Sequence, residues 1–373
     1  MKEKVILICY SLDNFESPRG LKWSRIANKL KNKYDLIEIK EKFSNIKSNS
    51  RPKSFFTYFK FLRFFRWPDY ATLWLLKQLP KIFTISKPKK IISVSHPFSS
   101  HIIGLLLKIK FRDVKWIIDI GDPFGIEVKI PANSWIFSPL NKFIERIALR
   151  KANIINVNSK ELKKSYIRTY QIPENKINVV NPIYDNNSKK YFNFTGGFKM
   201  IYGGRFYKNE RPISNIIEFA DFLRNKEIKF SIDIFGDMNA ENKKELTNQR
   251  LSSFIRIHES LAYDELQKEY SNYDFIINMS NKSDYQVPSK IPELLAQHKP
   301  IINITQNNND YFSKASKNFD HILNFRIEGN NELIVKKFML LKDKSIRDQR
   351  KIDLKIQNEL KSFSVDYQIK YYE

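Results

Sequence analysis

Short apolar runs alternate with amphipathic segments of helical length along almost the whole chain. In the first half, strand-like runs occupy Val5–Tyr10, Leu36–Ile39, Lys90–Val94, Trp116–Asp119, Ile154–Val157 and Ile177–Val180, and helical patterns occupy Leu21–Lys33, Ser99–Lys110, Asn141–Lys151 and Lys160–Tyr170. In the second half, strand-like runs occupy Lys199–Tyr202, Lys229–Phe235, Phe254–Ile257, Phe275–Asn278 and Pro300–Ile304. Continuous apolar strands are typical of parallel sheets buried on both faces. Because the alternation occurs twice, the pattern predicts an α/β fold with two doubly wound domains.

A polar, turn-rich stretch separates the two halves. Within Tyr184–Phe198 the chain reads Asp-Asn-Asn-Ser-Lys-Lys and then Thr-Gly-Gly, and a new apolar strand follows at once. We therefore predict an N-terminal Rossmann-like domain over residues 1–184, a linker over 185–197 and a C-terminal Rossmann-like domain over 198–343. The charged, helix-patterned segment 344–373 could pack back on the N-terminal domain.

The composition narrows the class of protein. Cys9 is the single cysteine, which rules out a disulfide framework and any zinc site with two or more thiolates, and this usage fits a reducing cytoplasm. Met1–Tyr10 has too short an apolar run for a signal peptide and is predicted to contain the first strand. No apolar run reaches the roughly 18 residues that a membrane-spanning helix needs.

The net charge of +25 is concentrated in the N-terminal half. Residues through Asp185 hold 35 Lys and Arg against 15 Asp and Glu, a net +20, whereas the remainder holds 30 against 25, a net +5. A large field of one sign indicates an anionic partner, which can be nucleic acid, an anionic membrane or a phosphorylated substrate. A low-GC genome would enrich lysine everywhere, but it would not produce this asymmetry.

The segment Lys53–Arg66 has seven aromatic residues and no acid. On a helix, Lys60, Arg63 and Arg66 lie on one side and several of the aromatic residues lie on the other. This pattern is typical of a basic amphipathic helix in an anionic interface, but aromatic stripes also commonly pack in protein cores. Two alternatives therefore remain open: a membrane or acceptor surface, or packing on the N-terminal sheet.

Two glycine loops carry candidate ligand-binding residues. The first strand runs into a loop that ends at Gly20, at the sheet edge where open α/β sheets bind ligands, and a glycine there lets a phosphate or sugar approach the backbone. In the second half, the turn Gly-Gly-Arg-Phe-Tyr-Lys supplies Arg205 and Lys208, whose cationic side chains suit a diphosphate. Taken alone, a glycine before a helix is more often a simple turn, and an isolated motif like the second loop is more often a solvated basic turn.

A third loop, within Tyr285–Ile302, has the pattern of a helix start that faces an anion. Pro292 suits the first turn of a helix and Ser289 is a plausible N-cap. The free amides around Ser289 and Lys290 would then face a phosphate. Glu293, one turn further on, points its carboxylate toward the same ligand, where it can accept hydrogen bonds from ribose hydroxyls.

Together these motifs resemble the donor site of retaining glycosyltransferase family 4. The donor-site motifs are Gly-Gly-Arg followed by Lys, then Pro-Ser-Lys-Ile-Pro-Glu-Leu-Leu-Ala and Lys-Pro-Ile-Ile. In the N-terminal half, Ser-Pro-Arg-Gly-Leu-Lys-Trp at 17–23 resembles the family's first glycine loop. The stretches at 95–104 and 116–123 resemble a bacterial subgroup that acts on surface polysaccharides. The similarity covers nearly the whole chain, with the motifs in the expected order.

The resemblance implies a GT-B fold, with two Rossmann-like domains facing an interdomain cleft. It also implies a sugar transfer from a UDP- or GDP-linked donor, bound mainly by the C-terminal half, to a glycan acceptor. Because the half that would bind the acceptor carries the excess positive charge, we expect that acceptor to be lipid-linked. The acceptor hydroxyl would attack from the front face with help from the leaving phosphate, so the anomeric configuration is retained without a protein nucleophile. We find no Asp-x-Asp motif in a suitable loop and therefore expect neither a metal nor a cofactor.

Site roles follow from the resemblance residue by residue. Arg205 and Lys208 would hold the donor diphosphate together with the amides around Ser289 and Lys290. Glu293 matches the second glutamate of the family's paired-glutamate motif and would bind the ribose.

The remaining implied contacts involve the sugar. The position of the first paired glutamate holds Tyr285, with Asp284 beside it, so the contacts to the sugar depart from the family pattern. Gly20 would let the donor phosphate or the acceptor lie against the first loop, and His96 would face the transferred sugar, with Asp122 at the edge of the cleft as a second catalytic candidate. His96 is equally a packed loop histidine, and Asp122-Pro123 is equally a common turn.

Two other classes fit parts of the sequence. A nucleic-acid-binding protein fits the charge, but no recognised nucleic-acid module is present and we expect no nucleic-acid partner. A nucleotide-sugar epimerase of GT-B shape fits the fold, but few acid or base groups are available at the sugar. We therefore expect a peripheral, cytoplasm-facing enzyme at an anionic inner membrane that extends a lipid-linked surface glycan.

Overall fold

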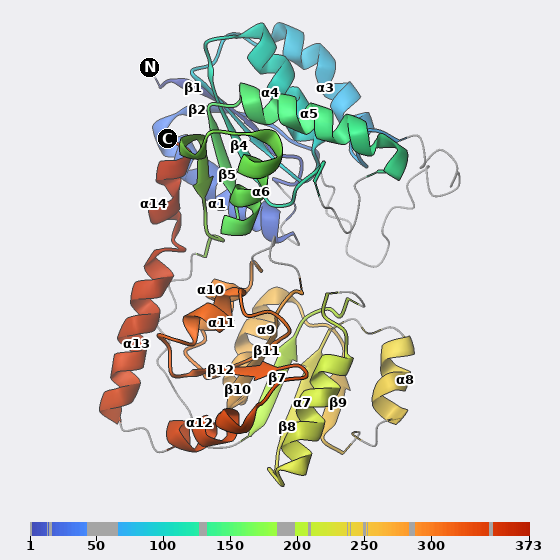
Figure 1. Cartoon of the computed structure of the whole chain (residues 1–373). Coiled ribbons are helices and arrows are strands. Elements are labelled where there is room, and N and C mark those ends of the chain that lie inside the picture. The colour runs from blue at the N-terminus through green and yellow to red at the C-terminus, as the bar shows by residue number, and fades with distance from the viewer. Residues whose placement is uncertain are drawn as a thin grey trace. The chain divides into compact units, whose positions relative to one another are not determined.

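The computed structural model describes residues 2–12, 14, 17–42, 66–126, 133–184, 198–207, 210–236, 238, 240–248, 251, 253–282, 288–342 and 346–373. The chain divides into two compact units: unit 1 comprises Met1–Ile183 and Val365–Glu373, and unit 2 comprises Tyr184–Ser364. Each unit is built on a six-stranded sheet whose strand pairings are all parallel. Helices cover these sheets, so the predicted α/β fold with two Rossmann-like domains is confirmed (Figure 1).

The sheet of unit 1 has the order β2-β1-β3-β4-β5-β6. Its strands are β1 Lys4–Ile8, β2 Asp35–Ile39, β3 Lys90–Val94, β4 Lys115–Ile120, β5 Ile154–Val157 and β6 Ile177–Val179. The chain runs from β1 outward to β2 and then returns to place β3 on the other side of β1. Such a reversal opens a crevice at the carboxyl ends of the two inner strands, where open α/β sheets bind ligands.

The helices of unit 1 are α1 Pro18–Lys33, α3 Thr72–Thr84, α4 Ser99–Lys110, α5 Ser138–Lys151 and α6 Lys160–Tyr170, and a 3-10 turn, η2 (Trp135–Phe137), precedes α5. Local signals define α6: the Ser159 side chain accepts from the Leu162 amide, and Gln171 adopts a left-handed conformation just after the helix. α4 lies close to its sheet because Gly104 has no side chain; a Cβ there would be 2.7 Å from Nε1 of the buried Trp116.

The sheet of unit 2 has the order β12-β11-β10-β7-β8-β9, so its reversal lies between β7 and β10. Its strands are β7 Lys199–Gly203, β8 Ser231–Phe235, β9 Ile255–His258, β10 Phe275–Met279, β11 Ile301–Thr305 and β12 Ile322–Arg326. We did not predict β12, because Asn324 and Arg326 interrupt its apolar residues, as an edge strand permits. The helices are α7 Ser214–Asn225, α8 Ala240–Asn248, α9 Tyr263–Glu269, α10 Ile291–Leu295, α11 Tyr311–Ala315, α12 Glu332–Lys342 and α13 Ile346–Lys361.

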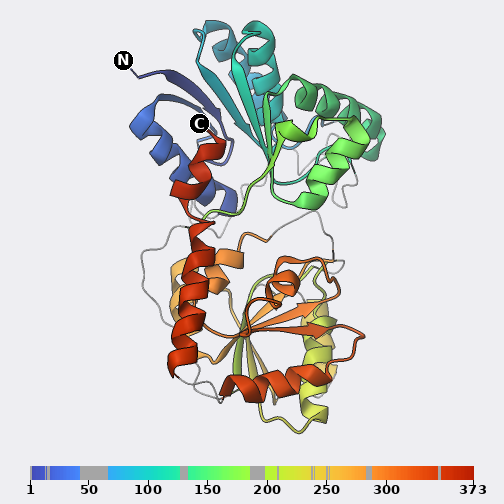
Figure 2. The same ribbon diagram turned by 60° about the vertical axis from the view of Figure 1, so that its left-hand side comes forward.

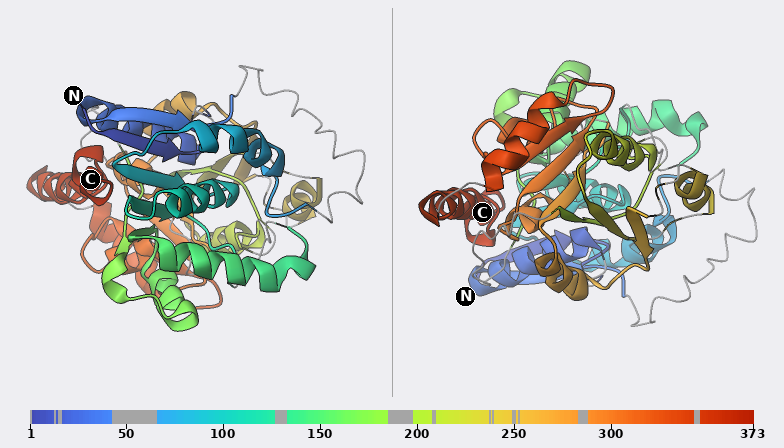
Figure 3. Two further views of the ribbon diagram at one scale, coloured as in Figure 1. Left: turned by 90° about the horizontal axis from the view of Figure 1, so that it is seen from above. Right: turned by 90° about the horizontal axis from the view of Figure 1, so that it is seen from below.

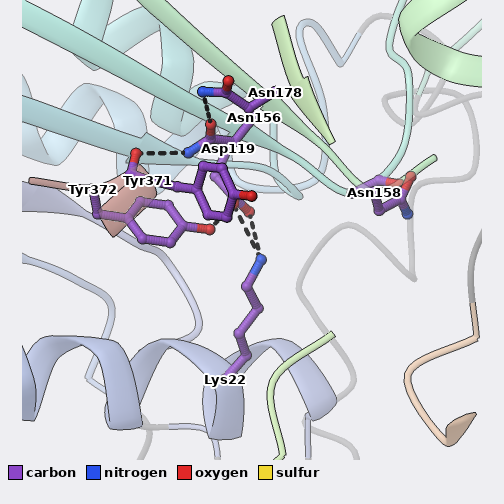
Figure 4. Close-up of polar contacts among 8 residues, drawn as sticks. Lys22, Asp119, Asn156, Asn158, Asn178, Tyr371 and Tyr372 are labelled. Atoms are coloured by element: carbon purple, nitrogen blue, oxygen red, sulfur yellow. Dashed lines mark hydrogen bonds and ion pairs between the residues drawn. The ribbon is translucent and has the colours of Figure 1, made fainter. Parts of the chain in front are cut away.

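The last nine residues belong to unit 1, whereas α13 belongs to unit 2. They form α14 (Val365–Gln368) and a 3-10 turn, and they lie beside α1 (Figure 2). Asp119 accepts hydrogen bonds from the buried Tyr372 hydroxyl and from Lys22 Nζ, the latter at 3.1 Å (Figure 4). Asn156 Nδ2 donates to the Tyr371 carbonyl at 3.1 Å. These bonds to β4 and β5 anchor the C-terminal residues on the unit 1 sheet.

Candidate functional site

Two loops and the first turn of α1 meet at the carboxyl edge of the unit 1 sheet and bring Arg19, His96 and Asp122 together. Arg19 lies in the first turn of α1, His96 follows β3, and Asp122 follows β4. The Arg19 guanidinium donates to the His96 carbonyl oxygen at 3.3 Å and to Asp122 Oδ2 at 3.2 Å. His96 Nε2 lies 3.9 Å from the same Asp122 oxygen. The structure therefore places the two predicted catalytic candidates side by side and adds Arg19, for which the sequence suggested no role.

The surroundings of His96 favour its neutral imidazole over the protonated ring. Burial lowers its pKa, the Arg19 cation lowers it further, and the Asp122 carboxylate opposes both. A neutral imidazole beside a carboxylate can accept a hydrogen bond or a proton from a hydroxyl group. The cluster thus offers one acceptor, one carboxylate and one fixed cation to a polar ligand.

A buried glutamate holds the loop that carries Asp122. Glu145 on α5 accepts hydrogen bonds from the amides of Phe124 and Gly125, each at 2.9 Å. It also accepts from the hydroxyls of Tyr166 at 2.9 Å and Tyr170 at 2.7 Å. Burial raises the pKa of Glu145, and these four donors act in the opposite direction. Because two of the bonds go to the backbone of the loop after β4, Glu145 fixes the conformation of that loop.

A second buried carboxylate, Asp69, holds the segment after His96. It accepts from the Ser99 amide at 2.9 Å and from the Ser99 hydroxyl at 2.7 Å, at the start of α4. Two residues further along, His101 is fully buried, with Nδ1 2.8 Å from the Ser93 hydroxyl. Burial lowers the pKa of His101 to about 3, so this ring is a neutral core residue.

Gly20 is tightly packed against the backbone of its own loop. A Cβ at this position would lie 2.0 Å from the carbonyl oxygen of Asn14 and 2.6 Å from that of Ser11. The loop's own backbone therefore fills the position that a Cβ would take, and glycine is required there for that reason. The expected contact of Gly20 with a donor phosphate or an acceptor stays a prediction.

In unit 2, four charged residues gather near the carboxyl end of β7. Lys290 Nζ donates to the Gly203 carbonyl oxygen at 2.5 Å, and it interacts electrostatically with Glu293, Arg211 and Arg205. Burial is the largest influence on Lys290 and lowers its pKa; the two arginines lower it further, and Glu293 raises it. The structure thus brings three of the predicted donor-binding residues together at the point where the strand order reverses.

Arg211 is the residue of this cluster that sequence reasoning missed. Tyr207 and Arg211 exchange backbone hydrogen bonds of 3.1 and 2.8 Å, which turns the chain back on itself after the glycines. The Arg211 guanidinium lies 5.0 Å from the centroid of the Tyr207 ring. This backbone turn brings Arg211 to the cluster, and the distance in sequence between Arg211 and the Gly-Gly pair does not predict the turn.

Close backbone approach explains the glycines beside the cluster. A Cβ on Gly236, just after β8, would lie 2.0 Å from the Gly204 carbonyl oxygen, and the Gly204 amide donates to the Phe235 carbonyl oxygen at 3.0 Å. A Cβ on Gly204 itself would lie 3.3 Å from Lys290 Nζ. A side chain at Gly236 would therefore collide with the backbone of Gly204, and a side chain at Gly204 would crowd Lys290.

The predicted helix start at Ser289 differs from the observed one. α10 is five residues long and its N-cap is Lys290, with no capping hydrogen bond from a side chain. Ser289 is exposed, the Ile291 amide already donates to the Pro288 carbonyl oxygen, and Pro292 has no amide hydrogen. The expectation that Ser289 caps this helix is wrong, whereas the expected role of the amides around Ser289 and Lys290 stays a prediction.

Several predicted residues lie outside the described residues. These are Lys208, Asp284 and Tyr285 of the donor site and Lys60 and Arg63 of the basic amphipathic segment. Arg66 is described and half-buried, directly before Trp67.

Two other features concern ions and membranes. Within the described residues, no three His, Cys, Asp or Glu side chains are grouped closely enough to hold a metal ion. Among the helices of those residues, none combines the length and apolar character needed to cross a membrane.

Comparison with known proteins gives the fold a name. Neither a family model nor a curated protein matches the sequence. Among solved structures, the chain is similar to sucrose-phosphate synthase from Thermosynechococcus elongatus, with a TM-score of 0.69 and 11% identity over 100% of this chain and 97% of that one. It is similar to the lipopolysaccharide outer core galactosyltransferase WaaB in its apo form, with a TM-score of 0.54 and 12% identity over 100% and 98%. A putative UDP-N-acetylglucosamine 2-epimerase from Listeria monocytogenes gives a TM-score of 0.55 and 11% identity over 95% and 91%.

These similarities define the class of protein by its fold. The chain has the GT-B fold, with two Rossmann-like units, and the similarity extends over whole chains. Glycosyltransferases and nucleotide-sugar epimerases both occur among the similar structures.

Proposed function

We propose that this protein is a glycosyltransferase that transfers a sugar from a nucleotide diphosphate donor held by unit 2. The observation that carries the proposal is the cluster of Arg205, Arg211, Lys290 and Glu293 at the strand-order reversal of the unit 2 sheet. Three cations and one carboxylate suit a ligand with a diphosphate at one end and hydroxyls at the other. A nucleotide sugar is such a ligand.

The cations would act on the leaving group. Negative charge on the donor diphosphate grows as the glycosidic bond breaks, and fixed cations in a partly buried site stabilise that charge without reorganising. Lys290 is held in place by the Gly203 carbonyl oxygen, and Glu293 would accept hydrogen bonds from the ribose. We propose that the reaction proceeds without a metal and with retention, by front-face attack of the acceptor hydroxyl.

Unit 1 would bind the acceptor. The cluster of Arg19, His96 and Asp122 can hold a sugar hydroxyl between a neutral imidazole and a carboxylate, with His96 nearest the reacting sugar. The excess positive charge of the N-terminal half supports an anionic acceptor or surface. We propose that the acceptor is a lipid-linked surface glycan, in the manner of family 4 transferases, and that the enzyme works as a peripheral protein at the cytoplasmic face of an anionic inner membrane.

Calorimetry with UDP and GDP tests the donor site. We expect one nucleotide to bind wild type, and Glu293→Ala or Arg205→Ala to weaken that binding by about 1.5–3 kcal/mol, the range for a hydrogen bond to a charged group. Arg224→Ala on α7 is the matched control, because Arg224 is an exposed cation of the same unit that pairs with Asp221. If both site variants bind as tightly as this control, the donor site is elsewhere.

An epimerase is the second candidate, because a putative UDP-N-acetylglucosamine 2-epimerase is among the similar structures. NMR of a nucleotide sugar incubated with the enzyme and no acceptor separates the two. Inversion at a sugar carbon without release of nucleotide would establish the epimerase, whereas nucleotide release that depends on an added acceptor supports the transferase.

A further inference from the structure

The three helices α3, α4 and α5 form one continuous layer over the unit 1 sheet (Figure 3). Lys110 at the end of α4 donates to three carbonyl oxygens at the end of α3, at 2.8 to 3.0 Å. Near the other end of α3, Trp67 Nε1 donates to Asn141 Oδ1 of α5 at 3.0 Å. These bonds fix the helices as a single rigid surface.

The outer face of this layer is unusually apolar. Of the eighteen large apolar side chains exposed in the described residues, seven lie on α3, α4 and α5, and two more, Trp135 and Ile136, lie on the 3-10 turn η2 that leads into α5. The most exposed are Phe83 at 78%, Trp135 at 77% and Phe143 at 61%, with Ile109, Leu73 and Leu76 at more than half. Such a concentration exceeds the scattered apolar residues of ordinary surfaces and marks a site of interaction.

The three helices carry exposed positive charge and no exposed acid. Lys77 and Lys81 project from α3, and Lys142, Arg146 and Arg150 project from α5, all exposed. Within the three helices the only acid is Glu145, and its carboxylate is buried under the loop after β4. Asp113, just beyond α4, is paired with Lys87 at 2.5 Å. Any partner must therefore accept both apolar side chains and a dense set of cations.

We infer that the exposed face of α3, α4 and α5 is a docking surface for an anionic lipid membrane. Aromatic and aliphatic side chains would enter the boundary between headgroups and acyl chains, and the lysines and arginines would contact anionic headgroups. A second copy of the chain is disfavoured, since two such faces would repel one another. The inference deepens the membrane attachment in the proposed function and rests on it, and it assigns the attachment to residues other than the segment Lys53–Arg66.

Trp135 gives the surface its own spectroscopic probe. Of the five tryptophans, Trp23, Trp74 and Trp116 are buried and Trp67 is half-buried, so Trp135 is the one that strongly contacts solvent. With vesicles of phosphatidylcholine and phosphatidylglycerol, we expect the emission of the full chain to shift to the blue and to be quenched by lipids brominated in the acyl chain. Trp135→Phe should lose this signal and still co-sediment with the vesicles.

Two double variants test the apolar side chains and the cations of the face separately. Trp135→Ser with Phe143→Ser, and Lys142→Glu with Arg146→Glu, should each weaken partitioning by tenfold or more. Leu333→Ser with Leu340→Ser on α12 is the matched control, because these exposed leucines of unit 2 also have lysines as neighbours. Folding of every variant is checked by thermal unfolding, and UDP or GDP binding should be unchanged.

Several outcomes would overturn the inference. It fails if wild type ignores anionic vesicles, if it binds neutral vesicles equally, or if the variants of this face partition like the α12 control. Concentration-dependent dimerisation that the serine variants abolish, without vesicle binding, would make the face a protein interface instead. Failure of nucleotide binding in wild type would reject the proposed transferase and leave the vesicle result standing, so the two failures are distinguishable.

Discussion

Replacing Glu145 tests whether one buried carboxylate holds the loop that carries Asp122. In Glu145→Ala the amides of Phe124 and Gly125 and the hydroxyls of Tyr166 and Tyr170 lose their acceptor together. A buried donor left unsatisfied costs about 1–3 kcal/mol, and the hydroxyls can rotate toward other partners whereas the amides cannot. Relief of the desolvated carboxylate offsets part of the loss, so we expect a destabilisation of about 3–4 kcal/mol.

Glu145→Gln is the informative partner of the alanine variant. Each carboxylate oxygen accepts from one backbone amide and one tyrosine hydroxyl. Whichever way a glutamine amide is turned, its NH2 group faces one backbone N–H, while the neighbouring hydroxyl can reorient to accept. One bond is therefore lost in place of four, and we expect a cost of about 1–2 kcal/mol.

Differential scanning calorimetry measures both variants. For a unit of this size, 1 kcal/mol corresponds to about 2–4 °C, so Glu145→Ala should lower the transition of unit 1 by roughly 10 °C and Glu145→Gln by roughly 4 °C. Glu174→Gln serves as the control, because Glu174 is an exposed residue of the same unit that pairs with Lys163. An alanine variant within 1 °C of wild type, or a glutamine variant less stable than alanine, would refute the reasoning.

Three further predictions concern pH, backbone packing and metals. Burial lowers the folded-state pKa of His101 to about 3, well below the unfolded value near 6.5. As pH falls from 6.5 toward 3, only the unfolded state binds the proton, so about 5 kcal/mol of stability is lost. Acid unfolding of His101→Gln should lack this loss, and parallel profiles would contradict it. Gly236→Ala places a Cβ 2.0 Å from the Gly204 carbonyl oxygen, so the unit 2 transition and nucleotide affinity should both fall, and unchanged calorimetry would show that the loop adapts. Sugar transfer should survive EDTA; loss of turnover that manganese or magnesium restores would contradict metal independence.

Sequence patterns predicted the elements well because buried parallel strands are continuously apolar. The predicted strand Lys90–Val94 and the predicted helices Ser99–Lys110 and Lys160–Tyr170 match β3, α4 and α6 at both ends. β12 was missed because an edge strand, which pairs on one side only, does not need an unbroken apolar run. The α/β class followed from the alternation, whereas the GT-B fold was expected from the family resemblance.

The candidate sites were predicted in part. Lys290 and Glu293 stood out because charged residues next to prolines and a following apolar strand form a local pattern, and the structure places them together with Arg205. Arg211 and Arg19 could not be found in that way. Each reaches its cluster through a backbone turn or a crossover, and these depend on residues far away in the chain.

The sequence by itself determined the strand and helix pattern, the location of positive charge in the first half and the candidate loops, since each of these is written in neighbouring residues. Only the tertiary structure decided which loops meet. The reversal of strand order brings the ends of β3 and β4 to the first turn of α1, and it brings Gly203 to Lys290, 87 residues later in the chain. It also showed that the carbonyl oxygens of Ser11 and Asn14 occupy the position that a Cβ on Gly20 would take. The order of residues along the chain does not reveal this close approach.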